Sequence, residues 1–276
     1  MQQITLEVGG IACRFEFNRD DIIEDVLERY GAFVVTNSSP AVEFRVDLVD
    51  ELNGVVSAQM AGLEPGIPEV SFNGGIIRYG RLEFTVDLEW EEGRAHARML
   101  PNIYSFDAIY RIFYTICTVK LGGVFLHAAS LVRNEKGYVF TGVTESGKSE
   151  ISEMAKVDSI HLTDELSVIL PVDGRFQAFG TPFWGLFATG GANRGVAVEK
   201  IFFLVRDTKT SEAPLTPAGA LPRLMRNVLN FARDPGFNTQ LFLNASQLLQ
   251  SVYFSELHCV PDPSIWPVVD SPVETS

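Results

Sequence analysis

The alternation of polar and apolar residues predicts a strand-rich beginning to this chain. Residues 4–8 alternate, Gly9 and Gly10 supply a turn, and residues 11–17 alternate again, which is the pattern of a β-hairpin. The stretch 53–73 is rich in glycine and proline, and its pattern leads to no assignment. Further candidate strands cover residues 41–48, 76–79 and 82–88.

Three segments have the spacing of a helix instead. Residues 18–30 place apolar side chains on one face, with Asn18 as the expected N-cap and Gly31 as the residue that ends the helix. Residues 105–121 carry apolar side chains at helical spacing and predict a well-buried helix. A third helix is expected over residues 219–231.

A change in composition near residue 105 suggests two parts. The chain has 276 residues, which allows one large domain or two of ordinary size. We place a strand-rich α+β domain at residues 1–104 and a second domain at residues 105–276. The tail, residues 261–276, is rich in proline and is expected at the surface or partly disordered.

Composition and charge exclude several classes of function. Hydrophobic residues make up 46% and charged residues 21%, which is a globular balance. The net charge of −13 disfavours nucleic acid as a partner. No apolar run approaches the roughly 18 residues of a membrane span, and the start, residues 1–10, has no apolar signal core. With Cys13, Cys117 and Cys259 far apart and expected as free thiols, these features predict a cytoplasmic protein that binds no membrane.

One glycine-bearing loop carries a specific motif for phosphate binding. Residues 138–141 read as a buried strand and residues 149–156 as a short helix. Between them the chain fits G-x-x-x-x-G-K-[ST], in the strand–loop–helix context that this motif requires. The motif residues are Gly142, Val143, Thr144, Glu145, Ser146, Gly147, Lys148 and Ser149. A chance match is the alternative, since the chain has 23 glycines, but four specified positions with the right flanks favour a binding loop.

The chemistry of this loop predicts ATP and Mg²⁺ as ligands. Backbone N–H groups of the loop and the N-terminus of the following helix favour an anion. Lys148 is expected to reach the β and γ phosphates, and the Ser149 hydroxyl to ligate Mg²⁺. Glu145 is unusual here, and either points outward or binds metal.

An acidic pair follows the loop in sequence. Residues 159–163 read as a strand that ends at Asp164 and Glu165. Carboxylates at a strand end beside a phosphate loop can ligate Mg²⁺ or accept the proton of an attacking hydroxyl, although such pairs are also common in solvated turns. Residues 166–179, with Asp173-Gly174 at the turn, predict an antiparallel hairpin where an ordinary P-loop protein continues through helical crossovers.

Four segments together resemble the HPr kinase/phosphorylase-like proteins, which are related in fold to the phosphoenolpyruvate carboxykinases. The segments are Leu126-His127-Ala128-Ala129-Ser130, the Gly142–Glu150 loop, Leu162-Thr163-Asp164-Glu165-Leu166 and Phe179-Gly180-Thr181-Pro182-Phe183-Trp184-Gly185. The last is more similar to the uncharacterised kinase-like branch. The resemblance covers about residues 123–204. It implies an α/β protein with a phosphoenolpyruvate-carboxykinase-like core containing a P-loop, behind the strand-rich domain.

The resemblance also implies roles for single residues. His127 would lie near the phosphates, although a lone histidine on an apolar strand is more often a core residue. Asp164 would accept a proton, Glu165 would be the second acidic residue, and Glu150 matches the residue after the lysine–serine pair. The signature of the bifunctional family members is matched only in part, at residues 194–198, so phosphorylase activity and HPr as the substrate are not implied.

The sequence therefore predicts an ATP-dependent kinase that phosphorylates a hydroxyl on a protein, peptide or small molecule. Asp164, His127 and Lys148 would be catalytic, residues 142–150 would bind the nucleotide, and Ser149, Asp164 and Glu165 would hold Mg²⁺. The alternative is a catalytically inactive nucleotide-binding sensor or scaffold. The sequence leaves open the acceptor, the choice among ATP, GTP and pyrophosphate, and assembly into a homo-oligomer.

Overall fold

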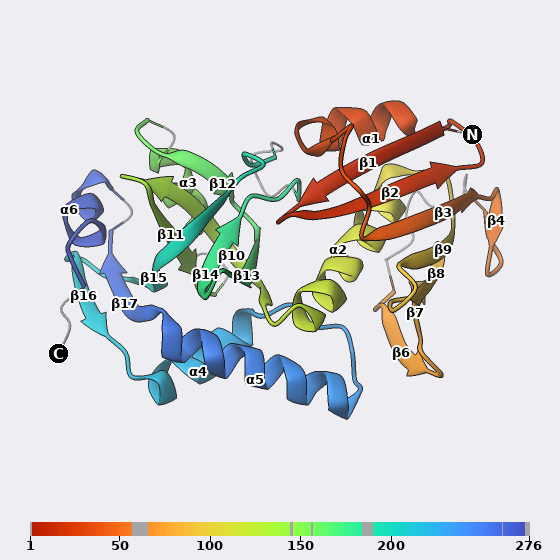
Figure 1. Cartoon of the computed structure of the whole chain (residues 1–276). Helices are drawn as coiled ribbons and strands as arrows, with labels where there is room; N and C mark the ends of the chain where they lie inside the picture. The colour runs from red at the N-terminus through yellow and green to blue at the C-terminus, as the bar shows by residue number, and fades with distance from the viewer. Residues whose placement is uncertain are drawn as a thin grey trace. The chain divides into compact units, whose positions relative to one another are not determined.

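The chain folds into two compact units with a mixed α/β architecture (Figure 1). The structure, a computed structural model, describes residues 2–56, 66–143, 146–155, 157–183, 190–260 and 262–273. Unit 1 comprises residues 1–116 and 230–238, and unit 2 comprises residues 117–229 and 239–276. Helix α2 (Ile103–Lys120) contributes residues to both units.

Unit 1 is built on a seven-stranded sheet with the order β1-β2-β3-β9-β8-β7-β6. Its strands are β1 (Gln2–Val8), β2 (Ile11–Phe17), β3 (Val42–Leu48), β6 (Glu69–Asn73), β7 (Ile76–Arg81), β8 (Phe84–Glu89) and β9 (Arg94–Met99). The two short strands β4 (Glu51–Leu52) and β5 (Val55–Val56) pair with each other. The hairpin predicted at residues 4–17 is confirmed, because β1 and β2 pair antiparallel around Gly9 and Gly10, whose φ angles are 65° and 76°.

One face of this sheet carries the core of unit 1. Phe15 and Phe44 point from neighbouring strands into an aromatic cluster with Phe106 and Tyr110 of α2. The ring centroids of Phe15 and Phe44 lie 4.8 Å apart. Residues in between face outward, as the alternation of strand side chains requires. The predicted helix over residues 105–121 is therefore confirmed. It begins two residues earlier than predicted and ends one residue earlier.

The first predicted helix is shorter than expected. Helix α1 spans Ile23–Tyr30, is followed by a 3₁₀ turn, η1 (Gly31–Phe33), and has no side-chain cap. The expected N-cap, Asn18, instead extends the sheet: its Nδ2 donates to the carbonyl of Leu48 (3.2 Å), and its Oδ1 accepts from the Leu48 amide (2.8 Å). The N-cap prediction is wrong because these backbone partners lie thirty residues along the chain, where no local pattern reveals them.

Unit 2 contains an eight-stranded sheet that closes on itself in part. The strand order is β11-β10-β13-β14-β15-β17-β16, β12 pairs with β10, and β11 also pairs with β15, so that five strands form a ring. The strands are β10 (Val124–Arg133), β11 (Lys136–Thr141), β12 (Ile160–Thr163), β13 (Leu166–Val172), β14 (Arg175–Phe179), β15 (Gly195–Arg206), β16 (Ser211–Pro214) and β17 (Tyr253–Cys259). Because β11, β15 and β17 run parallel, their carboxyl ends meet at one edge.

Three helices, α3, α4 and α5, follow strands of this sheet in sequence. Helix α3 (Lys148–Ala155) buries Ile151 and Ala155 in a core shared with β10, β11, β15 and β17. Helix α4 (Pro217–Asn227) begins at a Thr216 cap, which accepts a hydrogen bond from Gly219, and replaces the helix expected over residues 219–231. The long helix α5 (Pro235–Ser251) was not predicted.

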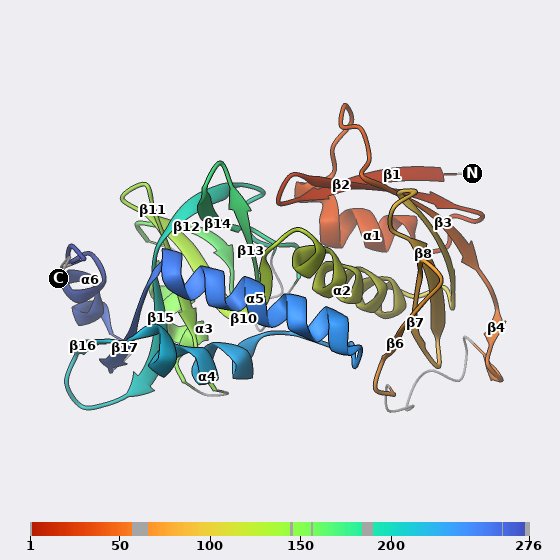
Figure 2. The same cartoon turned by 60° about the horizontal axis from the view of Figure 1, so that its bottom comes forward.

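The proline-rich tail is ordered against the sheet, so the expected surface tail is corrected for residues 263–270. A 3₁₀ turn, η3 (Pro263–Ile265), leads into α6 (Trp266–Val269), which lies beside β16 and β17 in both views (Figures 1 and 2). Ile265 and Val269 are fully buried. Arg133 lies over the Trp266 ring, 4.6 Å from its centroid, and pairs with Asp270 at 3.0 Å. The prolines of the tail obscure the pattern of a short apolar helix that packs in the core.

Two expectations about environment can be checked in the described part of the chain. Cys13, Cys117 and Cys259 are all free and buried, as predicted. None of the helices there has the length and apolar character required to cross a membrane.

Candidate functional site

The predicted phosphate loop joins the carboxyl end of β11 to the first residue of α3. Thr144 and Glu145 lie outside the described residues, so the expectations for them stay open. Gly147 has a φ of 106°, which side-chain-bearing residues rarely adopt. A Cβ atom on Gly142 would approach the Ser146 hydroxyl to 2.8 Å, so the chain needs glycine to turn here.

Lys148 points back into this loop. Its side chain is buried, at 8% exposure, and its Nζ donates hydrogen bonds to the carbonyls of Gly142 (2.8 Å) and Val143 (3.1 Å). Burial lowers the pKa of this amine, and the nearby Glu150 carboxylate acts in the opposite direction. The buried ammonium lies at the N-terminus of a helix. Both the positive charge and the helix N-terminus favour the binding of an anion.

A second buried polar group lies in the same loop. Ser146 is 6% exposed, and its Oγ has no hydrogen-bond partner among the described residues. A buried hydroxyl without a partner is costly, so this group is available to bond a ligand or a water. Ser149, the expected Mg²⁺ ligand, is half-buried in the first turn of α3.

Strand β10 brings the acidic pair and the loop to the same part of the sheet. On one side of β10, β11 ends with Thr141 opposite Ala128. On the other side, β12 and β13 pair with successive halves of β10, and Asp164 and Glu165 form the break between them. The Ala128 amide donates to the carbonyl of Glu165 (2.9 Å). The backbones of Thr141 and Glu165 are thus two strand spacings apart, about 10 Å.

His127 lies on β10 at this same place. Its carbonyl accepts a hydrogen bond from Thr141 Oγ1 (2.9 Å), and its residue pairs with Leu166 in β13. Since strand side chains alternate, His127 shares a face of β10 with Ala129 and Leu131, which pack in the core that contains α3. The half-buried imidazole is therefore on the loop side of the sheet.

A buried hydroxyl network holds the break between β12 and β13, and sequence reasoning missed it. Thr163 Oγ1 accepts from the amides of Glu165 and Leu166, both at 3.2 Å. Thr181 Oγ1 lies 3.1 Å from Thr163 Oγ1 and donates to the Leu166 carbonyl (2.7 Å). Ser167 adds bonds to Ser130 Oγ (3.0 Å) and to the Ala128 carbonyl (3.2 Å). This network fixes the backbone that carries the two carboxylates.

The segment after β14 packs directly on β12. The Thr181 amide donates to the Leu162 carbonyl (3.1 Å), and Ala192 donates to that of His161 (2.9 Å). A Cβ atom on Gly191 would overlap the Leu162 carbonyl oxygen. Phe183 is fully buried and contacts Phe125 edge-on, with ring centroids 5.7 Å apart, so it is a core residue. Trp184 and Gly185 lie outside the described residues.

Ser149 and the acidic pair offer oxygen atoms, the donor type that Mg²⁺ prefers. Asp164 is buried at 5% exposure, and Glu165 and Ser149 are half-buried. No group of three or more His, Cys, Asp or Glu side chains in the described ranges is placed to hold a metal. Mg²⁺ is commonly held by one or two carboxylates, with phosphates and water completing its shell, so one hydroxyl and two carboxylates fit an ion that arrives with a nucleotide.

An ion pair at the edge of the loop was also missed. Arg206, the last residue of β15, places its Nη2 3.0 Å from Oε1 of Glu150 in the first turn of α3. Arg194, the first residue of the partly matched signature, places its Nη2 3.8 Å from Oε2 of Glu135 in a long, exposed pair. The sequence gives no signal for Arg206, because β15 joins β11 only through the folded sheet.

Comparison with known proteins shows only weak similarity to a solved structure. No family model matches the chain, and no curated protein matches it. A solved structure described as the Hpr(Ser) kinase/phosphatase from Coxiella burnetii is similar with a TM-score of 0.25 and 18% sequence identity. The alignment covers 46% of this chain and 88% of that one. At this TM-score and identity, the family of the chain stays open.

Proposed function

We propose that the chain binds a nucleoside triphosphate with Mg²⁺ at residues 142–149 and transfers its terminal phosphoryl group to a hydroxyl. The acceptor is a protein, a peptide or a small molecule. One observation carries the proposal. Two buried polar groups, Lys148 Nζ and the Ser146 hydroxyl, lie in one glycine-bearing loop between a strand and a helix, and the hydroxyl has no partner among the described residues.

Binding would exchange partners within the loop. Lys148 would release the carbonyls of Gly142 and Val143 and donate to phosphate oxygens, which are stronger, charged acceptors. Burial lowers the pKa of Lys148 in the structure, and a phosphate beside it would raise that pKa again. The Ser146 hydroxyl would gain an acceptor, and the amides at the start of α3 would add to the anion site.

Transfer would use the acidic pair across β10. The acceptor oxygen attacks the γ phosphorus, the bond to the β-phosphate oxygen breaks, and the nucleoside diphosphate leaves. The proton of the acceptor hydroxyl moves to the carboxylate of Asp164, and His127 would orient the phosphate or the carboxylate. Ser149, Asp164 and Glu165 would hold Mg²⁺, which supplies neutralisation of the phosphate charge.

The proposal includes a phosphoenolpyruvate-carboxykinase-like core of the HPr kinase type. Its support is the path of the chain after the acidic pair. Strands β13 and β14 pair antiparallel across Asp173 and Gly174, with Val172 opposite Arg175, and β14 pairs antiparallel with β15. An ordinary P-loop protein would continue through helical crossovers at this point.

Two measurements test the proposal. Calorimetric titration of the protein with MgATP, MgGTP and pyrophosphate should show saturable binding of at least one. Incubation with γ-labelled nucleotide and a lysate of the source organism should then show label in an acceptor, with release of the diphosphate. Failure to bind any of the three ligands overturns the proposal. Binding without label transfer or turnover supports the alternative, a nucleotide-binding sensor or scaffold.

A further inference from the structure

Arg206 lies at the sheet edge from which the phosphate loop emerges. Strands β11 and β15 run parallel with Thr141 opposite Phe203, so both strands end at this edge. A Cβ atom on Gly142 would lie 3.4 Å from the carbonyl oxygen of Leu204, which shows how closely the loop passes the end of β15. Arg206 follows Leu204 by two residues and so lies on the strand beside the loop.

One partner of Arg206 comes from the loop's own helix. Glu150 is two residues after Lys148, and its carboxylate lies 3.0 Å from the Arg206 guanidinium. The two side chains are 58% and 48% exposed. An exposed pair of this kind contributes little to stability, so an incoming anion can replace the carboxylate at small cost. A guanidinium also matches phosphate in geometry better than an ammonium does.

We propose that Arg206 is a second cationic ligand for the phosphates bound at this loop, and that Glu150 holds it at the edge until nucleotide binds. The inference rests on the proposed function and adds to it a phosphate-binding residue and a competing carboxylate. It predicts opposite effects for the two members of one ion pair. Removing Arg206 weakens nucleotide binding, whereas removing the Glu150 charge strengthens it.

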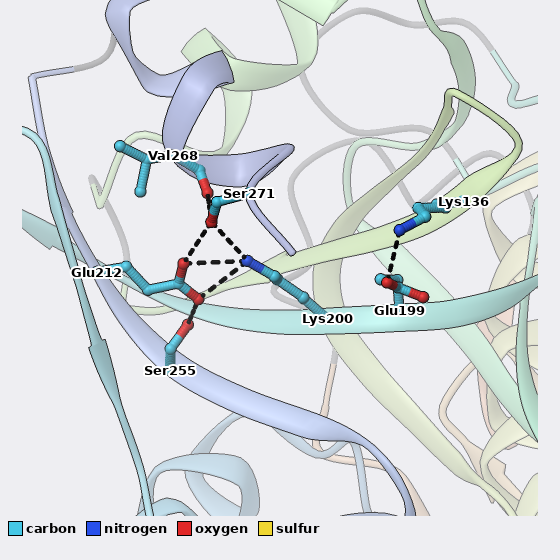
Figure 3. Close-up of polar contacts among 7 residues, drawn as sticks. All are labelled: Lys136, Glu199, Lys200, Glu212, Ser255, Val268 and Ser271. Carbon is cyan, nitrogen blue, oxygen red and sulfur yellow. Dashed lines mark hydrogen bonds and ion pairs between the residues drawn. The ribbon is translucent and has the colours of Figure 1, made fainter. Parts of the chain in front are cut away.

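The chain offers a matched control at the other end of the same two strands. Lys136, the first residue of β11, pairs with Glu199 of β15 at 2.7 Å (Figure 3). Their side chains are 44% and 34% exposed, close to the values for Arg206 and Glu150. Lys136→Gln therefore removes one positive charge from a similar ion pair in the same unit, at the edge of β11 opposite to the loop.

The test is calorimetric titration with MgATP of the wild type, Arg206→Gln, Glu150→Gln, the double variant and Lys136→Gln. Loss of a charged hydrogen bond should weaken binding by roughly tenfold in Arg206→Gln. Glu150→Gln should bind about two- to fivefold more tightly. The double variant should resemble Arg206→Gln, because Glu150 acts through Arg206, and Lys136→Gln should stay within about twofold of the wild type.

Each other outcome overturns the inference in an identifiable way. Equal weakening in Arg206→Gln and Lys136→Gln means that only the overall charge matters. Weaker binding in Glu150→Gln means that Glu150 itself contacts the ligand or its metal. Unchanged affinity in Arg206→Gln, with binding lost in Lys148→Ala, overturns this inference and leaves the proposed function standing. A wild-type protein that binds no MgATP, MgGTP or pyrophosphate overturns both.

Discussion

Lys148 and Asp164 are charged residues buried in the same unit, and burial of a charge is costly unless a partner or a function compensates it. Among the described residues, Lys148 donates to two backbone carbonyls, those of Gly142 and Val143. Neither residue supports the apolar core, so their chemistry can be separated from stability by conservative variants.

Lys148→Ala should weaken MgATP binding by about 1.5–3 kcal/mol, the range for losing a hydrogen bond to a charged group. The fold should persist, because the bonds that the amine makes to described residues, Gly142 and Val143, lie within its own loop. Calorimetry measures the affinity, and Lys136→Ala, an exposed lysine at the far end of β11, is the control. Equal affinity for wild type and Lys148→Ala would place the nucleotide elsewhere.

Asp164→Asn should lower the rate of phosphoryl transfer by about 10²–10⁴-fold, because it removes the proton acceptor. Affinity for MgATP should fall less, since the loop amides and Lys148 remain. Asp173→Asn is the matched control: it makes the same charge change in the β13–β14 turn, where a φ of 49° also suits asparagine. Normal turnover in Asp164→Asn would show that Asp164 has only a structural role in the turn.

Single residues were predictable where the motif is local. Gly142, Lys148 and Ser149 fall within eight consecutive positions, so the sequence shows them together. The roles of Arg206 and Thr181 were not predicted, because β15 and the segment after β14 reach the loop and the acidic pair through contacts that form only in the folded chain.

At the scale of elements, the break between β12 and β13 is the feature that positions the acidic pair. Both strands pair along β10, and in the turn between them the Thr163 hydroxyl accepts from two backbone amides. The surrounding hydroxyls of Ser130, Ser167 and Thr181 are buried, so water does not replace a lost hydrogen bond easily.

Thr163→Val should therefore cost about 1–3 kcal/mol of unfolding free energy, because the Glu165 and Leu166 amides lose their acceptor. Chemical denaturation measures this cost, and Thr163→Ser, which keeps the hydroxyl, should restore most of it. If the turn also places Asp164, Thr163→Val lowers the transfer rate at saturating nucleotide with little change in MgATP affinity. Full activity with reduced stability would show a purely structural role.

The elements that followed a local pattern were predicted well. The hairpins at residues 4–17 and 166–179 appear with their glycine turns, and helix α3 appears in its place. Helix α5 was missed, and the start of α1 and the tail were wrong, because distant partners decide them. Asn18 bonds to Leu48, and Trp266 packs beneath Arg133. The pairing of β11 with β15 is likewise non-local.

At the scale of the whole molecule, both units bury tyrosine hydroxyls. The free energy of unfolding should therefore fall with rising pH in the alkaline range. Burial is the main cause in each case. It raises the pKa of Tyr138 in unit 2 to about 12, with Asp270 adding to the effect. It also raises the pKa of Tyr30 and Tyr79 in unit 1 well above the usual value, with Asp107 adding to the effect at Tyr30.

The sign of the effect follows from which state loses the proton first. The unfolded chain releases these protons near pH 10, the ordinary value for tyrosine, whereas the folded chain retains them. The stabilisation is therefore complete below pH 10 and is lost as the pH rises through 12. Denaturation midpoints measured across this range should fall, and Tyr138→Phe should reduce the fall, whereas the exposed Tyr104→Phe should not. Ionisation of all seven tyrosines near pH 10 in a folded protein would contradict this.

The membership of residues 230–238 shows a limit at this scale. They belong to unit 1 although they lie between α4 and α5 in sequence, within a stretch otherwise assigned to unit 2. No change in composition marks them, because unit membership is a property of contacts and not of local pattern.

The hydrogen bonds that Lys148 makes within its own loop have a consequence for the speed of ligand capture. The amine donates to the carbonyls of Gly142 and Val143, so a phosphate can engage it fully only after at least one of these bonds opens. We expect association in two stages, a weak encounter followed by release of the lysine. In rapid-mixing experiments the observed rate should level off at high nucleotide concentration, whereas Lys148→Ala, which has nothing to release, should give a rate that rises linearly. The residue that binds the ligand is thus also the residue that bonds the loop together.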